Sequence, residues 1–448
     1  MKRYIILILL IVVSLAQLQA QTLSLDSCKY FALEHNKKIK EAKLKVNESE
    51  EVAKNAYTNF FPKVDAQAFA MKSNDYLLDV QTPEMNLPVY DGNPANLATA
   101  AQFAYVPSMN IQSLDYLNVG MVTATQPLYA GGRVRSGYKL ASLGEKINEE
   151  SLVLTTQQVV VKTEEYYWTL VSLNAKLNTL SSYEKMLTSL LKDVQVSYDA
   201  GLIQKSDLLK VQLKINEIHA NKLKLNNGIE LTKMALCQHI GIPYSDSLMV
   251  ADTTFTDVLP QSLYARPEAA LVNRSEYQML NKAIDAQILQ KRLARGEFMP
   301  QLAVGVMGQY LDVADKQNTY GIAFATLKIP ISDWWGGSHK LQEQKIKIAI
   351  AKNNLDEKSE LLKLQMEKTY KELTESYQQI TVAKSLEKEA REHLKVVADN
   401  HEAGIMSTSD LLEAQATFQQ AEDGLVNAQS TYQICQVYYK QAIAKLSY

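Results

Sequence analysis

The sequence predicts a mainly α-helical chain with a small β-strand part, built as two copies of one unit. The stretch from His401 to Gln415 repeats, without a gap, a stretch that begins 203 residues earlier at Tyr198. In both stretches a glycine is followed, after four residues, by Ser-Asp-Leu-Leu. The same offset pairs apolar positions outside them, such as Leu170 with Leu373. A register kept over this distance indicates an internal duplication.

The first residues have the three parts of a secretory signal peptide. Lys2 and Arg3 form a basic start, an apolar run follows to Ala16, and a polar end leads to Ala20. We expect cleavage after Ala20, with cleavage after Ala16 as the alternative, and neither cut is followed by a cysteine that could carry an acyl anchor. The predicted division is a signal peptide, 1–20, a first repeat, 21–265, and a second repeat, 266–448.

Charge and cysteine content give no sign of a nucleic-acid partner or of a disulfide framework. Removing Lys2 and Arg3 changes the formal net charge from −2 to −4, which is too near neutral to favour nucleic-acid binding. Cys28, Cys237 and Cys435 are odd in number and none matches another at the repeat offset, so we expect buried or free thiols. After the signal no apolar run reaches about 18 residues, the minimum for a transmembrane helix, so any entry into a membrane would be as strands.

Each repeat begins with apolar residues at helical spacing and reaches a proline. The pattern predicts helices over 25–61, with Asp26 as a candidate N-cap, and over 267–298. Pro62 and Pro300 end these helices because proline lacks the backbone N–H that a helix interior needs.

Directly after each of these prolines the apolar period changes from about 3.6 to 2, which predicts amphipathic strands. Each strand is followed by a loop and a return strand. Four strands of about 9 to 11 residues have the length of tilted strands in an outer-membrane barrel. The predicted strands start at Val64 and Leu302, return over 117–128 and 320–330, and are joined by loops over 73–115 and 312–319.

Two very long helices are predicted where proline is absent, between Pro127 and Pro243 and after Pro330. Apolar residues recur every three or four positions over 145–196, the spacing of a coiled coil, and at about 1.5 Å per residue this helix would span roughly 75 to 80 Å. In the repeated stretches Gly201 and Gly404 supply left-handed C-caps, and the Ser-Asp pairs supply capping oxygens. The returning helices are predicted over 207–240 and 410–446.

The chain lacks the usual sequence signatures of catalysis and cofactor binding. It contains no HExxH, GxSxG, phosphate-binding loop or CxxC motif. The six histidines occur singly, and His393 and His401, eight residues apart, have no third ligand beside them. We therefore expect no catalytic residue, no metal site and no cofactor, and a soluble helical enzyme is disfavoured.

Two groups of side chains are candidates for a role in transport. Asp410 and Glu413 lie one helical turn apart, where they are either a capping residue with a solvated neighbour or, in a symmetric oligomer, part of an acidic ring that selects by charge. Trp334 and Trp335 follow the last strand, and Tyr129 takes the matching place in the first repeat. Aromatic residues at strand ends form a membrane-interface girdle or fill the joint between strand and helix.

On these residues the chain resembles the TolC-type outer-membrane efflux proteins over its whole mature length. The resemblance rests on Asn36 to Ala42 before FFPKV, the second start EFMPQL, the two Gly-x4-Ser-Asp-Leu-Leu stretches and the alternation of strands and helices. It implies a homotrimer in the outer membrane of a Gram-negative bacterium, contacting lipid through a shared barrel and extending into the periplasm as a helical tunnel. Four strands cannot close a barrel, whereas three chains would supply twelve.

The resemblance also implies a function. The chain would be the passive exit duct of a tripartite efflux or type I secretion system, docked to a periplasmic adaptor and an inner-membrane pump. Adaptor binding would untwist the inner helix pairs and widen a constriction. The residues carried over are Asp410, Glu413 and Asp207 for the constriction and Gly201, Leu202, Ile203, Gly404, Ile405 and Met406 for the adaptor-facing tips.

Two residues depart from the family pattern and leave the gate contacts open. Met406 replaces a frequent basic residue after the second glycine, and His401 occupies an aromatic position that Tyr198 fills in the first repeat. The alternative function is a periplasmic coiled-coil adaptor. That class would show one helical hairpin flanked by small β domains, and two hairpins interleaved with four amphipathic strands oppose it.

Overall fold

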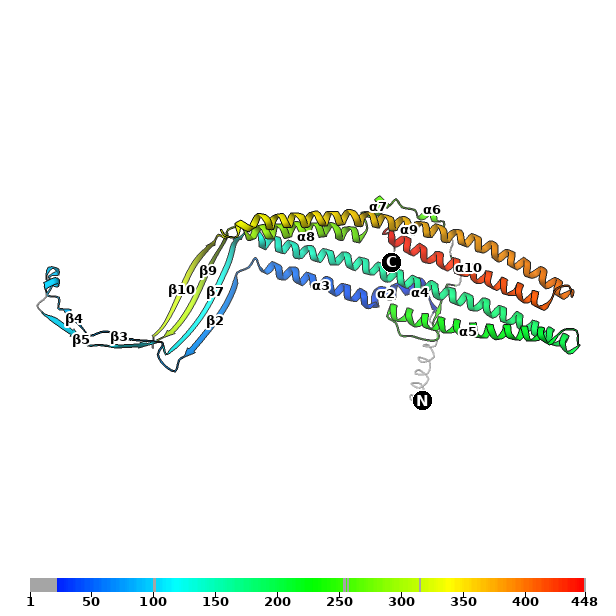
Figure 1. Ribbon diagram of the computed structural model, residues 1–448, viewed down its shortest axis with the longest axis horizontal. Helices are drawn as coiled ribbons and strands as arrows, with labels where there is room; N and C mark the ends of the chain where they lie inside the picture. The colour runs from blue at the N-terminus through cyan, green and yellow to red at the C-terminus, as the bar shows by residue number, and fades with distance from the viewer. Residues whose placement is uncertain (1–21, 100–101, 253–254, 256–257, 314–315, 447–448) are drawn as a thin grey trace, which may run out of the picture. The chain divides into compact units, whose positions relative to one another are not determined.

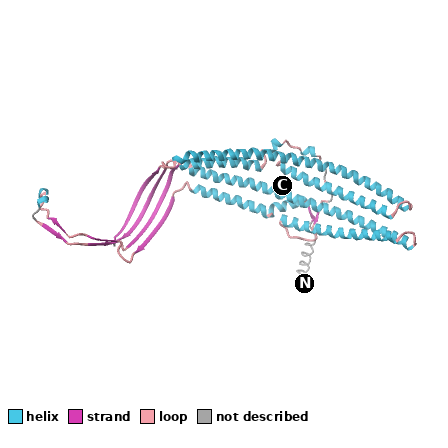
Figure 2. Cartoon of the chain, in the orientation of Figure 1, coloured by secondary structure: helices cyan, strands magenta, loops and turns pink. Residues whose placement is uncertain are grey.

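The computed structural model describes residues 22–99, 102–252, 255, 258–313 and 316–446, so the expected signal peptide, 1–20, lies outside the described residues. The chain forms two compact units. A helical unit contains residues up to 50, 143–286 and 348 onward, and a sheet unit contains residues 51–142 and 287–347. Helices make up most of the described chain (Figures 1 and 2).

The sheet unit is built on one antiparallel sheet with the strand order β10-β9-β7-β2 (Figure 2). All four strands predicted from the alternating pattern are present, and β2 and β10 are its outer strands. The predicted loop over 312–319 is wrong, because β9 and β10 continue into it. There the polar side chains find partners across the sheet: Asp312 accepts hydrogen bonds from Tyr116 Oη and Asn118 Nδ2. The strands are β2 Lys63–Lys72, β7 Tyr116–Ala130, β9 Gln301–Val313 and β10 Lys316–Lys328.

The predicted loop over 73–115 contains a narrow β-ribbon. Its four short strands form two antiparallel pairs, β3 with β6 and β4 with β5, one following the other. The alternation is too short in each strand to be recognised in the sequence alone. The elements are β3 Leu78–Gln81, β4 Met85–Pro88, the 3₁₀ helix η2 Pro94–Thr99, β5 Phe103–Val106 and β6 Asn110–Ser113.

The predicted long helices are confirmed and exceed the expected length. The helix predicted over 145–196 is α4, which has 67 residues, and its counterpart α9 has 69. The full set is α2 Leu25–His35, α3 Lys37–Thr58, α4 Arg133–Asp199, α5 Lys205–Ile240, α6 Pro260–Leu263, α7 Pro267–Leu271, α8 Ser275–Glu297, α9 Trp334–Glu402 and α10 Thr408–Ala442, with the two-residue parallel strands β1 Thr22–Leu23 and β8 Met249–Val250.

Two of the predicted helices are interrupted. The helix expected over 25–61 is α2 and α3, separated at Asn36, and its N-cap is Ser24 rather than Asp26. The buried Asn36 side chain accepts a hydrogen bond from Lys38 N (2.8 Å) and donates one to His239 O (2.7 Å), so it caps α3 and ties the break to the end of α5. The segment expected over 267–298 is likewise divided into α7 and α8.

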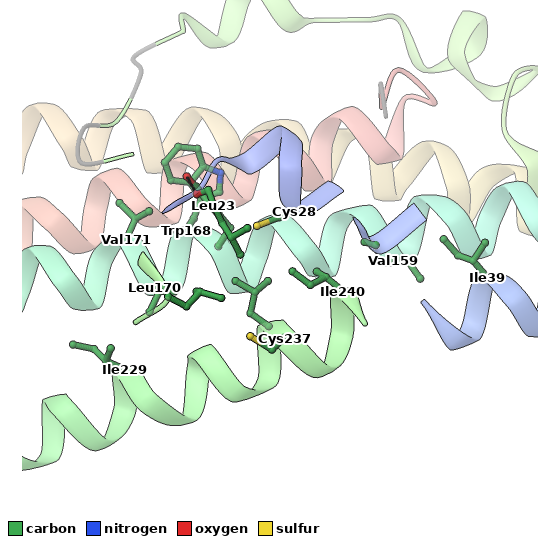
Figure 3. Close-up of a cluster of buried hydrophobic side chains, with 14 residues drawn as sticks. Leu23, Cys28, Ile39, Val159, Trp168, Leu170, Val171, Ile229, Cys237 and Ile240 are labelled. Carbon is green, nitrogen blue, oxygen red and sulfur yellow. Dashed lines mark hydrogen bonds between the residues drawn. The ribbon is translucent and has the colours of Figure 1, made fainter. Parts of the chain in front are cut away.

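Apolar side chains of the helical unit form three main clusters. Figure 3 shows one of them, to which Leu170 from α4, Ile240 from α5 and Cys28 from α2 contribute. Among the described residues the three cysteines are free, as predicted, with Cys28 and Cys237 buried. Burial raises the pKa of the Cys28 thiol to about 12, so this sulfur stays protonated and unreactive at neutral pH.

Candidate functional site: the two helical tips

The two long helices end in turns with the same backbone structure. Gly201 and Gly404 have φ angles of 75° and 73°, a left-handed conformation that glycine adopts without strain. Gly201 N donates to Tyr198 O (2.8 Å), and Gly404 N donates to His401 O (2.9 Å). We call these two turns the tips, residues 198–207 and 401–410.

At each tip one large apolar side chain points to solvent and the next is partly buried. Leu202 and Ile405 are 78% and 74% exposed. Ile203 and Met406 pack instead against a cluster that contains Val194, Leu208, Val397 and Leu411, from all four helices that meet at the tips. Leu202 and Ile405 are therefore the tip side chains available to a partner, and Ile203 and Met406 hold the turns on the helices.

The predicted capping oxygens are confirmed for Asp410 at the second tip and are wrong for Ser409 and for the first tip. The N-cap of α10 is Ser407, two residues before Ser409, and it forms a capping box with Asp410. Ser407 Oγ accepts from Asp410 N (3.3 Å), while Asp410 Oδ2 accepts from Ser407 N (2.9 Å) and Ser407 Oγ (2.7 Å). At the first tip the N-cap is Gln204, without a side-chain cap. The first returning helix therefore has the weaker start.

The two hairpins are joined at the tips by one lysine. Lys210 Nζ on α5 lies 3.2 Å from Asp207 Oδ1 and donates to Ser409 Oγ on α10 at 2.8 Å. Since Ser409 precedes Asp410 in the chain, this contact places Asp207 and the beginning of α10 around one ammonium group. Lys210 was not singled out by the sequence pattern, because a lysine on the exposed face of a helix carries no signal of its partner on another helix.

Asp410 and Glu413 are both exposed on the first turns of α10. Hydrogen bonds from the Ser407 side chain and backbone lower the pKa of Asp410 below its ordinary value. Within a single chain Asp410 is therefore a stable anion with a structural role. The capping box could have been predicted, since Ser407 stands three residues before an acid in front of an apolar run.

His401 takes part in the second tip through a hydrogen bond to the backbone. Its Nδ1 donates to Met406 O at 3.0 Å. An imidazole at this position therefore closes the turn onto Met406, one of the two residues that depart from the family pattern. Tyr198, at the matching place of the first tip, is partly buried against the apolar cluster that Ile203 and Met406 also contact.

The aromatic residues at the strand ends have different environments. Trp335 is 82% exposed, whereas Trp334 is half exposed and donates from Nε1 to Phe298 O at 2.8 Å. Both lie in the first turn of α9, and Tyr129 lies in β7 with half of its surface exposed. Trp334 thus contributes to the joint between strand and helix, while Trp335 and Tyr129 are free to contact a surrounding medium.

The described residues contain neither a metal-binding cluster nor a helix that could cross a membrane. No group of three or more His, Cys, Asp or Glu side chains is placed to hold a metal ion. None of the helices that the structure describes is both long and apolar enough to cross a membrane.

The sequence matches the model of one protein family over most of its length. The model of the outer membrane efflux protein family matches residues 30–241 and 267–444. The chain belongs to this family. Solved structures of outer membrane proteins share its fold. Comparison with curated protein sequences gives no match.

Three solved structures illustrate the likeness to this outer membrane efflux protein. The outer membrane protein VceC from Vibrio cholerae has a TM-score of 0.73 at 14% identity, covering 94% of this chain and 95% of VceC. The CmeC outer membrane channel from Campylobacter jejuni gives 0.72 at 15% identity, with 94% and 85% covered. The open state of the MtrE outer membrane channel from Neisseria gonorrhoeae gives 0.73 at 14%, with 94% and 88% covered.

Proposed function

We propose that three copies of this chain form a closed β-barrel in the outer membrane of a Gram-negative bacterium, continued by a helical tunnel in the periplasm. The observation that carries the proposal is the sheet β10-β9-β7-β2, which ends at β2 on one side and β10 on the other. Unpaired strand edges cost several kcal/mol per backbone group in lipid, so the two edges need partners. Identical copies supply them by pairing β2 of one chain with β10 of the next.

The two faces of this sheet differ in polarity. Cross-strand register places Val64, Val122, Val306 and Ala323 on one face, whose residues near mid-strand are apolar or small. The opposite face carries the polar side chains Lys63, Asp65, Gln67, Thr123, Thr125 and Gln309, together with the apolar side chains Phe69, Met121, Met307, Ile322 and Phe324. The first face is the one that suits lipid.

Exposure agrees with this orientation. On β9, Val306 and Tyr310 are exposed, while Met307 and Gln309, on the opposite face, are partly buried. On β9 the side chains of the face that contains Gln309 are thus less exposed than those of the other face, as expected on the inside of a curved sheet. In a barrel the inner face lines the lumen, so the polar side chains would line a water-filled duct.

The helical tips are the proposed docking site for a periplasmic adaptor that links the duct to an inner-membrane pump. Gly201 and Gly404 shape the turns, and Leu202 and Ile405 present exposed apolar side chains on them. Exposed apolar side chains on rigid turns are suited to pack into a partner's groove. The duct itself would conduct substrates passively, since the family and its structural neighbours are channels.

Asp410, Glu413 and Asp207 are the proposed acidic constriction. Three-fold repetition would bring copies of the exposed Asp410 and Glu413 carboxylates together around the axis, and a ring of acids attracts cations. Lys210, bonded to Asp207 and Ser409, would hold the two hairpins in the closed arrangement. Adaptor binding would open the constriction by separating these helices.

The test is to purify the mature chain from outer membranes in detergent, measure its mass and record its conductance in planar bilayers. A trimer with a small conductance that prefers cations supports the duct, and a monomer without conductance refutes it. The double variant Asp410→Asn with Glu413→Gln tests the constriction. Loss of cation preference is expected, and an unchanged preference would remove these residues from the pore. Glu389→Gln, an exposed acid on α9, is the matched control.

A further inference from the structure

The β-ribbon between β2 and β7 is longer than a strand connection requires, and the function proposed above does not use it. The ribbon begins where Ser73 N donates to Asp115 O (2.7 Å) and continues through Leu77 N to Leu114 O (3.3 Å) and Thr82 N to Met109 O (2.9 Å). It therefore leaves the end of the sheet as a continuation of two of its strands (Figure 1). The corresponding strands β9 and β10 pair as far as Val313 and Lys316, which are three positions apart in the chain.

The first part of the ribbon, β3 with β6, has one apolar and one polar face. Leu78 pairs with Ser113 and Val80 with Ile111, whereas the alternate pairs are Asp79 with Gln112 and Gln81 with Asn110. Paired residues lie on the same side of a ribbon. One face therefore presents Leu78, Val80 and Ile111, and the other presents a carboxylate and three amides.

Within the described residues, no other segment buries the apolar face of the ribbon. Leu78 is 43% exposed, and Val80 and Ile111 are each 47% exposed. A two-stranded ribbon is only marginally stable in water without a third layer. An apolar face on such a ribbon is expected to pack against something else.

Charge argues against a lipid surface as the cover. Residues 73–115 contain five acids, at 75, 79, 84, 91 and 115, and no Lys, Arg or His. An anionic membrane surface would repel such a segment. The apolar face itself carries none of these acids: Asp79 is on the opposite face, and Asp115 is paired with Lys72 at 2.6 Å. Two such faces can meet without bringing carboxylates into contact.

We propose that the ribbon's apolar face, Leu78, Val80 and Ile111, packs against the same face of the ribbons of two further copies of this chain. The inference rests on the proposed trimer, in which three identical ribbons leave one rim of the barrel. Rotational symmetry turns the same face of each ribbon toward the axis or away from it. Turning Leu78, Val80 and Ile111 inward buries the apolar side chains and leaves Asp79 and the amides in water.

The test uses single cysteines on the two faces of β3, in purified trimer that carries Cys435→Ser to remove the one native thiol that is not fully buried. Val80→Cys is the probe and its neighbour Gln81→Cys is the matched control. A short bismaleimide should link most Val80→Cys chains into dimers and leave Gln81→Cys chains at the level of the background protein. A polar maleimide should label Val80→Cys more slowly than Gln81→Cys.

Each outcome decides the proposal. Trimer that shows neither selective linkage nor slower labelling overturns the packing and leaves the proposed duct intact. Slower labelling without linkage assigns the face to lipid or to a different protein, and overturns self-packing. A monomer in detergent refutes the duct and this packing with it. A variant that fails to assemble is replaced by Ile111→Cys with Gln112→Cys, which sample the same two faces on β6.

Discussion

A charged residue at Val306 tests the orientation of the sheet most directly. Val306 lies near the middle of the 13-residue strand β9, on the face that is apolar around mid-strand, and it is exposed in the single chain. Gln309 lies three residues along the same strand on the polar face. We therefore compare Val306→Arg with Gln309→Arg, which place the same side chain on opposite faces, about 10 Å apart along the strand.

The expected effect follows from the position of Val306 near mid-strand. Arginine facing lipid near the middle of a bilayer costs about 2–4 kcal/mol in a β-barrel. A trimer carries the change three times, so the assembled state would lose about 6–12 kcal/mol, comparable with the whole stability of an ordinary domain. Arginine at 309 would face water in the lumen, and the expected cost is within about 0.5 kcal/mol per chain.

The assay is the yield of heat-resistant trimer recovered from outer membranes, followed by the midpoint of its thermal unfolding in detergent. Val306→Arg should strongly reduce the trimer yield, while Gln309→Arg should behave as the parent. If both variants assembled equally well, or if only Gln309→Arg failed, the assignment of the two faces would be wrong. A control with Val306→Leu keeps the position apolar and should assemble.

Three further predictions concern local structure. Gly404→Ala should lower the free energy of unfolding by about 1–2 kcal/mol, because φ is 73° and open space surrounds the added Cβ, so left-handed strain is the whole cost. Gly131→Ala should lower it clearly more, because the added Cβ would also lie 2.8 Å from Met299 Cβ. Equal losses in the unfolding midpoint would contradict this. Ser407→Ala should lower the free energy of unfolding by about 1 kcal/mol, because it removes the N-cap of α10. Hydrogen exchange should become faster in the first turn of α10 only, and unchanged protection of those amides would refute the capping role. Burial, followed by the neighbouring lysines, lowers the pKa of His239 below 6.5. The contribution of His239 to folding stability should therefore be complete above pH 6.5 and be lost as the pH falls through the lowered pKa. His239→Gln should weaken this decline in the unfolding midpoint, whereas a variant with the same pH dependence as the parent would exclude His239 as its source.

Local patterns were sufficient for the long helices, the four strands of the main sheet and the two tips. The period of 2 after Pro62 and Pro300 located β2 and β9, and the absence of proline after Pro330 allowed α9 to be predicted as one long helix. The glycines of the repeated stretches marked both tips, because a left-handed C-cap is a requirement of the backbone itself. These features depend on residues close together in sequence.

Predictions failed where a distant contact chose between local alternatives. The helix expected over 25–61 breaks at Asn36 because that side chain bonds to His239 at the end of α5. The loop expected over 312–319 is strand because Asp312 has partners on β7. In both places the local sequence permits more than one conformation, and the partner that selects one lies about 200 residues away.

The sequence by itself determined the repeated hairpins, the four amphipathic strands and the positions of the turns, since helix and strand periods and glycine caps act over a few residues. Only the tertiary structure decided which side chains share a face or a partner. Cross-strand register placed Val306 between Ala124 and Ala323, and the packing of two hairpins brought Lys210 to Ser409. Register and helix packing are set by contacts between distant segments, which a single sequence does not display.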